Sequence, residues 1–166
     1  MVGQEVRLQS SAQVGGNADP GPHRGQGEPV SCSGLIEHLT PEFAAAATRL
    51  IQSGDVYFFP IRTRGGAVAG RADDATPFAH RQANFSVVAL GTNRARLAAA
   101  WDDLYQHLAG VYLSCETDQR PERLDDAFPP ATLARLRKLK RRYDPENVFR
   151  DNFNVSPAAS DPGAVA

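Results

Sequence analysis

The sequence lacks the long apolar runs that mark secretion or membrane insertion. Its first 15 residues contain no apolar stretch of signal-peptide length, and no run of about 18 apolar residues occurs anywhere in the 166-residue chain. We therefore expect a cytoplasmic protein with no membrane partner. The length suits one domain, with a short tail at most.

Cysteine is scarce, and so is any excess of charge. The two cysteines, Cys32 and Cys115, are far apart and have no C-x-x-C spacing, so we expect reduced structural thiols and no redox dithiol. The four histidines have no H-x-x-x-H spacing, and no metal site is predicted. The formal net charge of -1 provides no general attraction to nucleic acid, so no nucleic-acid partner is expected.

The two ends of the chain lack periodicity. The first 30 residues are rich in Gly, Pro, Gln and Asn, and they cannot bury enough apolar area to offset the cost of ordering. We predict a disordered leader over 1–30, a single domain over 31–157 and a disordered tail over 158–166. Order is expected to begin near Leu35.

Between these ends, hydrophobic periodicity predicts an α+β domain with mostly antiparallel strands. Thr40 and Pro41 are typical of a helix start, as a cap and as the first helical residue, and Gly54 is a natural stop. Pro60 confines its strand to an edge or to the strand's end. The predicted order is a helix over 41–53, a strand over 56–62, a hairpin or excursion over 62–77, a strand over 84–90, helices over 93–109 and 132–143, and an extended tail.

The last predicted helix has one apolar and one basic side. Leu133, Leu136, Leu139 and Tyr143 are expected to point inward. The basic residues span eight positions, namely Arg135, Arg137, Lys138, Lys140, Arg141 and Arg142. A solvated face is the simplest interpretation of this charge, and a surface for a partner or an anionic ligand is the alternative. After the helix, Asp144 is expected to cap a short helical turn.

Two residues are candidates for acid–base chemistry. Histidine is a common acid–base group in enzymes, but His80 has no visible partner in the sequence, which favours a structural role. Tyr112 lies in "GVYLSCETD", where alternation predicts a strand with Tyr112 and Ser114 on one side. It is either a buried phenol with a satisfied hydroxyl or a base, and a base would need a cation or an electron-deficient cofactor nearby.

The stretch "LARLRKLKRRYDPENVFRDNFNVSP" resembles the C-terminal signature of the berberine-bridge-enzyme-like FAD-linked oxidoreductases. The family signature is a helix followed by Tyr-Asp-Pro-x-Asn-x-Phe and then by Asn-x-Asn before a proline. Upstream, "GGAVAGRADDATPFAHR", "NFSVVAL" and "WDDLYQHL" resemble the family's hairpin, next strand and following helix. The resemblance covers roughly residues 35–157.

This resemblance implies part of the family's antiparallel substrate-domain sheet covered by helices, then a C-terminal helix and an extended tail that returns to the flavin. FAD would be the cofactor, and a small molecule with an alcohol or amine-type carbon would be the substrate. Tyr112 would be the catalytic base or would orient the substrate. Asn152 and Asn154 would bind the cofactor, with Asn154 nearer the flavin. Ser114 and Cys115 stand where the family usually has Asn and often has an aromatic residue.

The resemblance also implies a partner. Family members carry a long N-terminal FAD-binding domain, and a disordered leader is expected in its place here. This chain alone should therefore bind FAD weakly or not at all, and a separate FAD-binding polypeptide would complete a split or truncated oxidase. The alternative is a non-catalytic remnant or docking module. A third hypothesis is an anion-binding or scaffold protein that acts through its basic helix.

Overall fold

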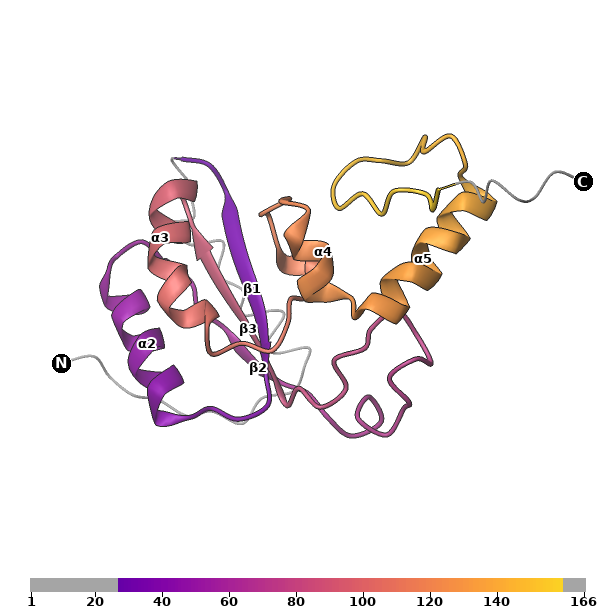
Figure 1. The fold of residues 1–166 in the computed structure, drawn as a ribbon. Helices are drawn as coiled ribbons and strands as arrows, with labels where there is room; N and C mark the ends of the chain where they lie inside the picture. The colour runs from indigo at the N-terminus through magenta and orange to yellow at the C-terminus, as the bar shows by residue number, and fades with distance from the viewer. Residues whose placement is uncertain (1–26, 160–166) are drawn as a thin grey trace, which may run out of the picture.

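The computed structural model describes residues 27–159, so most of the predicted leader and tail lies outside the described residues (Figure 1). The predicted α+β class with antiparallel pairing is confirmed. The elements are β1 (Val30–Ile36), α2 (Pro41–Gln52), β2 (Ile61–Thr63), β3 (Phe85–Gly91), α3 (Arg94–Tyr105), the 3-10 turn η1 (Leu113–Cys115), α4 (Glu122–Ala127) and α5 (Pro130–Tyr143). Within residues 27–159, every helix is too short or too polar to span a bilayer.

The sheet has three antiparallel strands in the order β1-β3-β2, so β3 is central. Val87 is the partner of Gly34 on β1 and of Ile61 on β2. Directly opposed residues point to the same face of a sheet, and the next residue points to the other face. Ser86 and its partner Arg62 therefore lie on the face opposite to Val87.

Helices α2 and α3 pack side by side on the Val87 face and enclose the core (Figure 1). The helix starts follow from their caps. The Thr40 hydroxyl accepts a hydrogen bond from Phe43 N at 3.2 Å, and Asn93 Oδ1 accepts one from Arg96 N at 3.0 Å. The largest buried side chains of this core are Phe43, Leu50, Leu97, Trp101, Leu104 and Val87. Each contributes about 1.5–3 kcal/mol by leaving water.

Two elements were absent from the prediction, β1 and α4. Strand β1 begins at Val30, five residues before Leu35, and its sequence "VSCSGLI" alternates small polar residues with apolar ones. Its composition therefore resembles that of a loop, although both faces are covered. Helix α4 has only six residues, "ERLDDA", which is too short for a periodic pattern. It lies between the predicted helices over 93–109 and 132–143.

Pro60 limits the predicted strand over 56–62, as expected. Only Ile61–Thr63 forms a ladder with β3, and Phe58 makes an isolated bridge to Leu90. The following segment over 64–80 contains turns and no strand, so it is an excursion and not a hairpin. It extends from the sheet toward the first turn of α5, where Arg135 Nη1 donates to Asp74 O at 3.0 Å (Figure 1).

The outer edge of β1 is covered by the segment that follows α3. Leu35 N donates to Gly110 O at 2.8 Å, and Ala109 N donates to Leu35 O at 2.7 Å. Farther along, Ser33 N donates to Glu116 Oε2 at 2.9 Å. The strand predicted in "GVYLSCETD" is wrong, because these residues turn through η1 and bind the edge largely through side chains.

Helix α5 projects from the domain, and the tail folds back beside it (Figure 1). Leu133 is buried as predicted, but Leu139 and Tyr143 are 40% and 72% exposed, so the inward placement of these two is wrong. The predicted helical turn after Tyr143 is a simple turn. Asp144 does cap it, because its carboxylate accepts hydrogen bonds from Val148 N at 2.7 Å and Phe149 N at 3.0 Å. The ion pair with Lys140 is the main cause of the lowered pKa of Asp144.

We expect Gly110→Ala to destabilise the domain. A Cβ at position 110 would lie 2.3 Å from His80 Cε1, so the imidazole ring would have to move. Overpacking of this kind costs about 1–3 kcal/mol. The matched control is Gly70→Ala, where no atom lies closer than 3.8 Å to the new Cβ. Urea unfolding of both variants measures the difference, and equal midpoints would contradict the packing.

Candidate functional site

The three site residues predicted from the sequence line two separate pockets. Tyr112 lines a pocket of about 530 Å³ on the sheet face opposite to α2 and α3, together with Arg62, Thr63, Arg64, Gly65, Val68 and Ser86. Asn152 and Asn154 share a pocket of about 330 Å³ between the tail, α5 and α4. The structure therefore brings the two asparagines together and places Tyr112 on another surface.

Tyr112 is held through its backbone by the neighbouring strand. The Ser33 hydroxyl donates to Tyr112 O at 2.9 Å and accepts from Tyr112 N at 3.2 Å. Ser33 is fully buried, so this double contact is shielded from water. The position of Tyr112 relative to β1 is consequently fixed by one serine.

The ring of Tyr112 belongs to an aromatic and cationic cluster. It meets Phe78 edge to face, with centroids 6.4 Å apart and an interplanar angle of 80°. The guanidinium carbon of Arg64 lies 5.5 Å from the Tyr112 centroid and 4.3 Å from that of Phe78. The sequence hypothesis of a tyrosine base required a nearby cation, and Arg64 supplies one.

His80 and Arg81 make contacts that suit structural roles. His80 Nε2 lies 3.0 Å from Asp126 O and 3.2 Å from Ala127 O, so it carries a hydrogen and donates to these two carbonyls. Arg81 is buried and donates to Thr76 Oγ1 and, at 3.4 Å, to the carbonyl of residue 68. His80 thus joins the excursion over 64–80 to α4, and Arg81 holds the excursion together.

The two tail asparagines, Asn152 and Asn154, differ in the hydrogen bonds that their side chains make. Asn152 has a left-handed backbone, with φ of 62°, and its Oδ1 accepts a hydrogen bond from Gln119 Nε2 at 3.1 Å. Asn154 Nδ2 donates to Ser156 Oγ at 3.4 Å, but Asn154 Oδ1 is buried and has no hydrogen-bond partner in the structure. A buried acceptor without a donor costs about 1–3 kcal/mol.

This orphaned oxygen is the observation that tests whether a flavin fits. The edge of an isoalloxazine ring presents an N–H donor between two carbonyl acceptors, so it can satisfy Asn154 Oδ1 and accept hydrogen bonds from amide groups. The pocket volume of about 330 Å³ is at the small end of ligand sites, which suits a ring edge and not a whole dinucleotide. The residues present therefore fit the edge of FAD.

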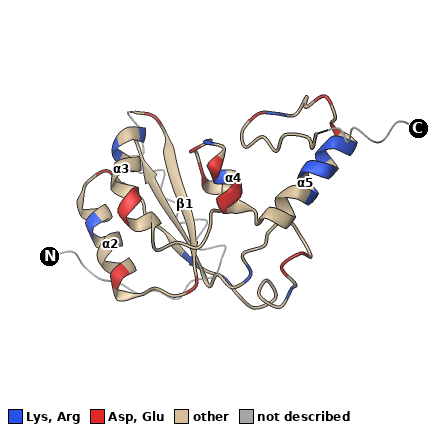
Figure 2. Ribbon diagram, in the orientation of Figure 1, with Lys and Arg blue, Asp and Glu red and all other residues tan. Residues whose placement is uncertain are grey.

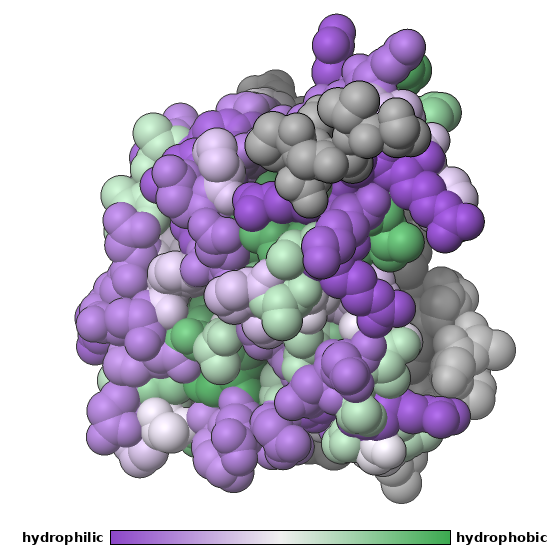
Figure 3. Space-filling model, turned by 45° about the vertical axis from the view of Figure 1, so that its right-hand side comes forward, coloured by the Kyte–Doolittle hydropathy of each residue, from purple (hydrophilic) through white to green (hydrophobic). Residues whose placement is uncertain are grey.

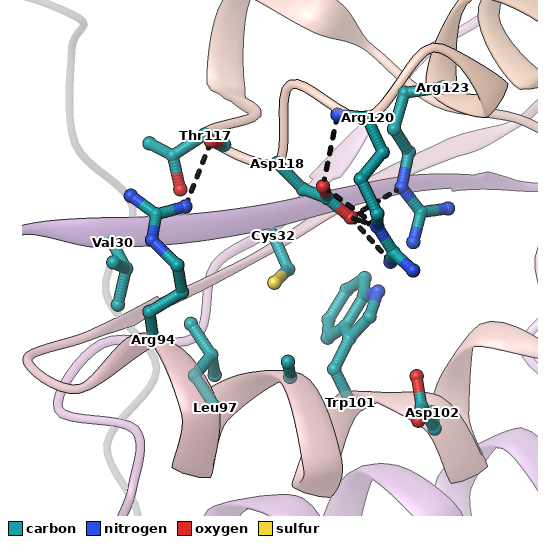
Figure 4. Close-up of a pocket in the computed structure, with 11 residues that line it drawn as sticks. Val30, Cys32, Arg94, Leu97, Trp101, Asp102, Thr117, Asp118, Arg120 and Arg123 are labelled. Carbon is teal, nitrogen blue, oxygen red and sulfur yellow. Dashed lines mark hydrogen bonds and ion pairs between the residues drawn. The ribbon is translucent and has the colours of Figure 1, made fainter.

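A third pocket, of about 340 Å³, lies between β1, α3 and the loop before α4 (Figure 4). Its arginines are already paired. Asp118 accepts hydrogen bonds from Arg120 Nη2 at 2.6 Å and Arg123 Nε at 2.9 Å, and Arg94 Nη2 lies 2.6 Å from Glu28 Oε1. Arg120 is the largest of the contacts that hold the pKa of Asp118 well below its usual range. These contacts fix the loop that precedes α4.

A buried acid, Glu116, and a half-buried thiol, Cys32, complete this region. Glu116 accepts hydrogen bonds from Ser33 N at 2.9 Å, Thr117 N at 2.9 Å and Asp118 N at 2.8 Å, while burial raises its pKa. Burial likewise raises the pKa of the Cys32 thiol to about 12, which keeps it protonated and unreactive. Both Cys32 and Cys115 are free thiols in the structure, in accord with the prediction.

Sequence reasoning missed the polar groups around Tyr112. Arg62, Arg64 and Ser86 were assigned to turns and strands without a role. Their convergence depends on the register between β2 and β3, which pairs Arg62 with Ser86. A signal was present in the alternation of "RTR", because residues two apart on a strand share a face.

Comparison with known proteins finds similarity over parts of the chain. Residues 121–156 match the family model described as berberine and berberine like. A 48-residue segment is 38% identical to (R)-6-hydroxynicotine oxidase of Paenarthrobacter nicotinovorans, covering 29% of this chain and 10% of that protein. A 52-residue segment is 40% identical to the uncharacterized FAD-linked oxidoreductase YvdP of Bacillus subtilis (strain 168), covering 31% and 11%.

The fold is also similar to that of a solved family structure. Berberine bridge enzyme from Eschscholzia californica superposes with a TM-score of 0.61 at 18% identity, over 80% of this chain and 34% of that protein. The chain thus spans about a third of the length of that enzyme. The signature, the fold and the relatives agree. These matches support a likeness between this chain and the C-terminal part of the berberine-bridge-enzyme-like FAD-linked oxidoreductases.

Proposed function

We propose that this chain supplies substrate-facing and flavin-edge side chains to an FAD-dependent oxidase. The observation that carries the proposal is the orphaned Asn154 Oδ1, which lies in a pocket within the segment that matches the family model. The 38% identity to an oxidase and the 40% identity to an FAD-linked oxidoreductase support the choice of cofactor. When bound, the flavin supplies the hydride acceptor for an alcohol or amine-type carbon, and oxygen takes the electrons.

Each of the chain's own site residues would have a separate role. Asn154 and Asn152 would bind the ring edge. Tyr112 would orient the substrate or, as a phenolate, take a proton from it at the phenolic oxygen, and Arg64 would stabilise the negative charge of the phenolate before the transfer. The hydrogen bonds from Ser33 fix the Tyr112 backbone, so little reorganisation is needed when substrate binds.

The outer end of α5 suits the docking of a flavin-binding polypeptide. Tyr143, Val148 and Phe149 are 72%, 66% and 83% exposed, and they surround the last turn of α5. Exposed apolar groups that lie close together mark interaction surfaces. The last turns of α5 are also the main concentration of basic charge on the described helices (Figure 2). Figure 3, which brings the α5 side of the molecule forward, shows hollows in which hydrophobic residues are visible.

The second candidate is a docking module without catalysis. Cys115 and Ser114 differ from the residues usual in the family, and both lie beside Tyr112. In this case the same exposed end of α5 would bind a partner, but Tyr112 would be dispensable. Substitution of Tyr112 separates the two candidates.

We expect the isolated chain to bind a bare flavin ring as well as it binds FAD. Only the ring edge would contact the protein, so lumiflavin and FAD should perturb the Asn154 side-chain amide signal in NMR spectra with similar, weak affinities. Asn154→Ala should weaken both by about 10-fold, equivalent to one lost hydrogen bond of about 1.4 kcal/mol. Asn84→Ala is the control, because Asn84 donates to Glu37 O away from the pocket. Spectra unchanged by either flavin would refute flavin-edge binding.

We expect Tyr112→Phe to lower turnover while flavin content stays the same. The chain would be co-expressed with the FAD-binding portion of a family oxidase that lacks its own C-terminal third, and oxygen consumption and visible absorbance would be measured. Loss of a positioned acid–base group reduces turnover by about 100-fold or more. Tyr57→Phe, a change at a residue that is half exposed, is the control. Unchanged turnover in Tyr112→Phe would favour the docking module.

A further inference from the structure

We propose that the Tyr112 pocket selects a substrate with a carboxylate on a small apolar body, and that Arg62 and Arg64 bind the carboxylate. The inference rests on the proposed function, because it names the substrate class of the same site. It starts from the charge of the pocket. The lining residues include two arginines and no aspartate or glutamate.

These two arginines are unneutralised in the described part of the chain. Neither Arg62 nor Arg64 forms an ion pair within residues 27–159. The pocket in Figure 4 has the opposite arrangement, since the figure shows Arg120 and Arg123 bound to Asp118. Its third arginine, Arg94, pairs with Glu28, which the figure does not draw. The arginines of that pocket have carboxylate partners, whereas Arg62 and Arg64 have none within the described residues.

The register of the sheet aims these cations at one place. Arg62 is the partner of Ser86 on β3, on the face away from α2 and α3. Arg64 is two residues farther along and follows the same face, with its backbone N–H donating to Asn84 O at 2.6 Å. The Ser86 hydroxyl lies on the same wall of the pocket. Two guanidinium groups and one hydroxyl can therefore converge on one bound group.

An unused hydrogen-bond donor points to the same conclusion. Arg64 Nε is buried and has no hydrogen-bond partner among residues 27–159. Arg81 Nε is a second buried orphan. The guanidinium carbons of Arg64 and Arg81 lie 4.3 Å and 5.3 Å from the centroid of the same Phe78 ring, so two like charges share one aromatic side chain. A bound anion would relieve this repulsion and satisfy Arg64 Nε.

The shape of the pocket indicates what accompanies the anion. Val68 and the ring of Tyr112 provide apolar wall, and the volume of about 530 Å³ lies within the range of small-molecule sites. A guanidinium group presents paired donors in a plane, which matches the two oxygens of a carboxylate. A carboxylate held at Arg62 and Arg64 would place the apolar body against Tyr112.

The test is an NMR titration of the full chain with four probes at constant ionic strength. The probes are benzoate, its neutral analogue benzamide, acetate, and inorganic phosphate. We expect benzoate to shift the Nε–Hε signal of Arg64 and to bind at least 10-fold more tightly than benzamide or acetate. Equal affinities for benzoate and benzamide would overturn the proposal. Tighter binding of phosphate than of benzoate would also overturn it, in favour of a phosphate site.

Substitutions locate the site. Arg64→Gln and Arg62→Gln should each weaken benzoate about 10-fold, and Arg64→Lys should fall between Arg64→Gln and the unchanged protein, because it keeps the charge and loses the fork. Arg71→Gln, at an exposed arginine outside the pocket, is the matched control and should bind normally. Arg62 is exposed, so its variant should fold even where Arg64→Gln does not. Unchanged benzoate affinity in Arg62→Gln and Arg64→Gln would overturn the assignment.

The two proposals fail separately. Shifts of the Asn154 amide by lumiflavin report on the flavin edge, and shifts of Arg64 Nε by benzoate report on the substrate pocket. Benzoate binding without any lumiflavin effect would refute the flavin-edge role and support the carboxylate site. Lumiflavin binding without benzoate binding would support the flavin-edge role and overturn the carboxylate site.

Discussion

The attachment of residues 109–118 to the outer edge of β1 is the constraint on which the described site depends. Strand edges carry unpaired N–H and C=O groups that must find partners. Here Gly110 and Glu116 supply them through backbone and carboxylate oxygens, and the Ser33 hydroxyl serves the backbone of Tyr112 in both directions. Because Ser33 and Glu116 are buried, these contacts are shielded from water, and Tyr112 is held at a fixed distance from β3.

Sequence patterns predicted the elements that have strong periodicity or caps. Helix α2 follows from Thr40 and Pro41, and the predicted helices over 93–109 and 132–143 contain α3 and all but the first two residues of α5. Strand β1 could not be predicted in this way, since its polar positions are satisfied by the distant residues Glu116 and Thr117. The predicted burial of Leu139 and Tyr143 on α5 was wrong for a similar reason. Amphipathic spacing shows which side of a helix is apolar, and it does not show whether anything covers that side.

The candidate-site residues likewise divide into those that local sequence predicted and those that depend on the fold. Tyr112, Asn152 and Asn154 were named from a resemblance in local sequence, and the structure places the two asparagines in one pocket. The arginines beside Tyr112 depend on strand register, which joins residues 62 and 86. The net charge of -1 gave no sign of these arginines, because a sum over the whole chain does not separate arginines that pair with carboxylates from those that do not. The distinction between arginines with and without carboxylate partners exists only in three dimensions.

The unsatisfied atoms give the strongest physical argument that both pockets serve ligands. Arg64 Nε and Asn154 Oδ1 are buried without partners among the described residues, and the side chains that carry them line the Tyr112 pocket and the asparagine pocket. Each such atom costs about 1–3 kcal/mol, against a total stability of about 5–15 kcal/mol for a typical domain. Two apolar side chains of similar volume would remove that cost. These polar groups favour the fold only when a ligand supplies the missing hydrogen bonds. A ligand group with acceptors would satisfy Arg64 Nε, and a ligand edge with a donor would satisfy Asn154 Oδ1.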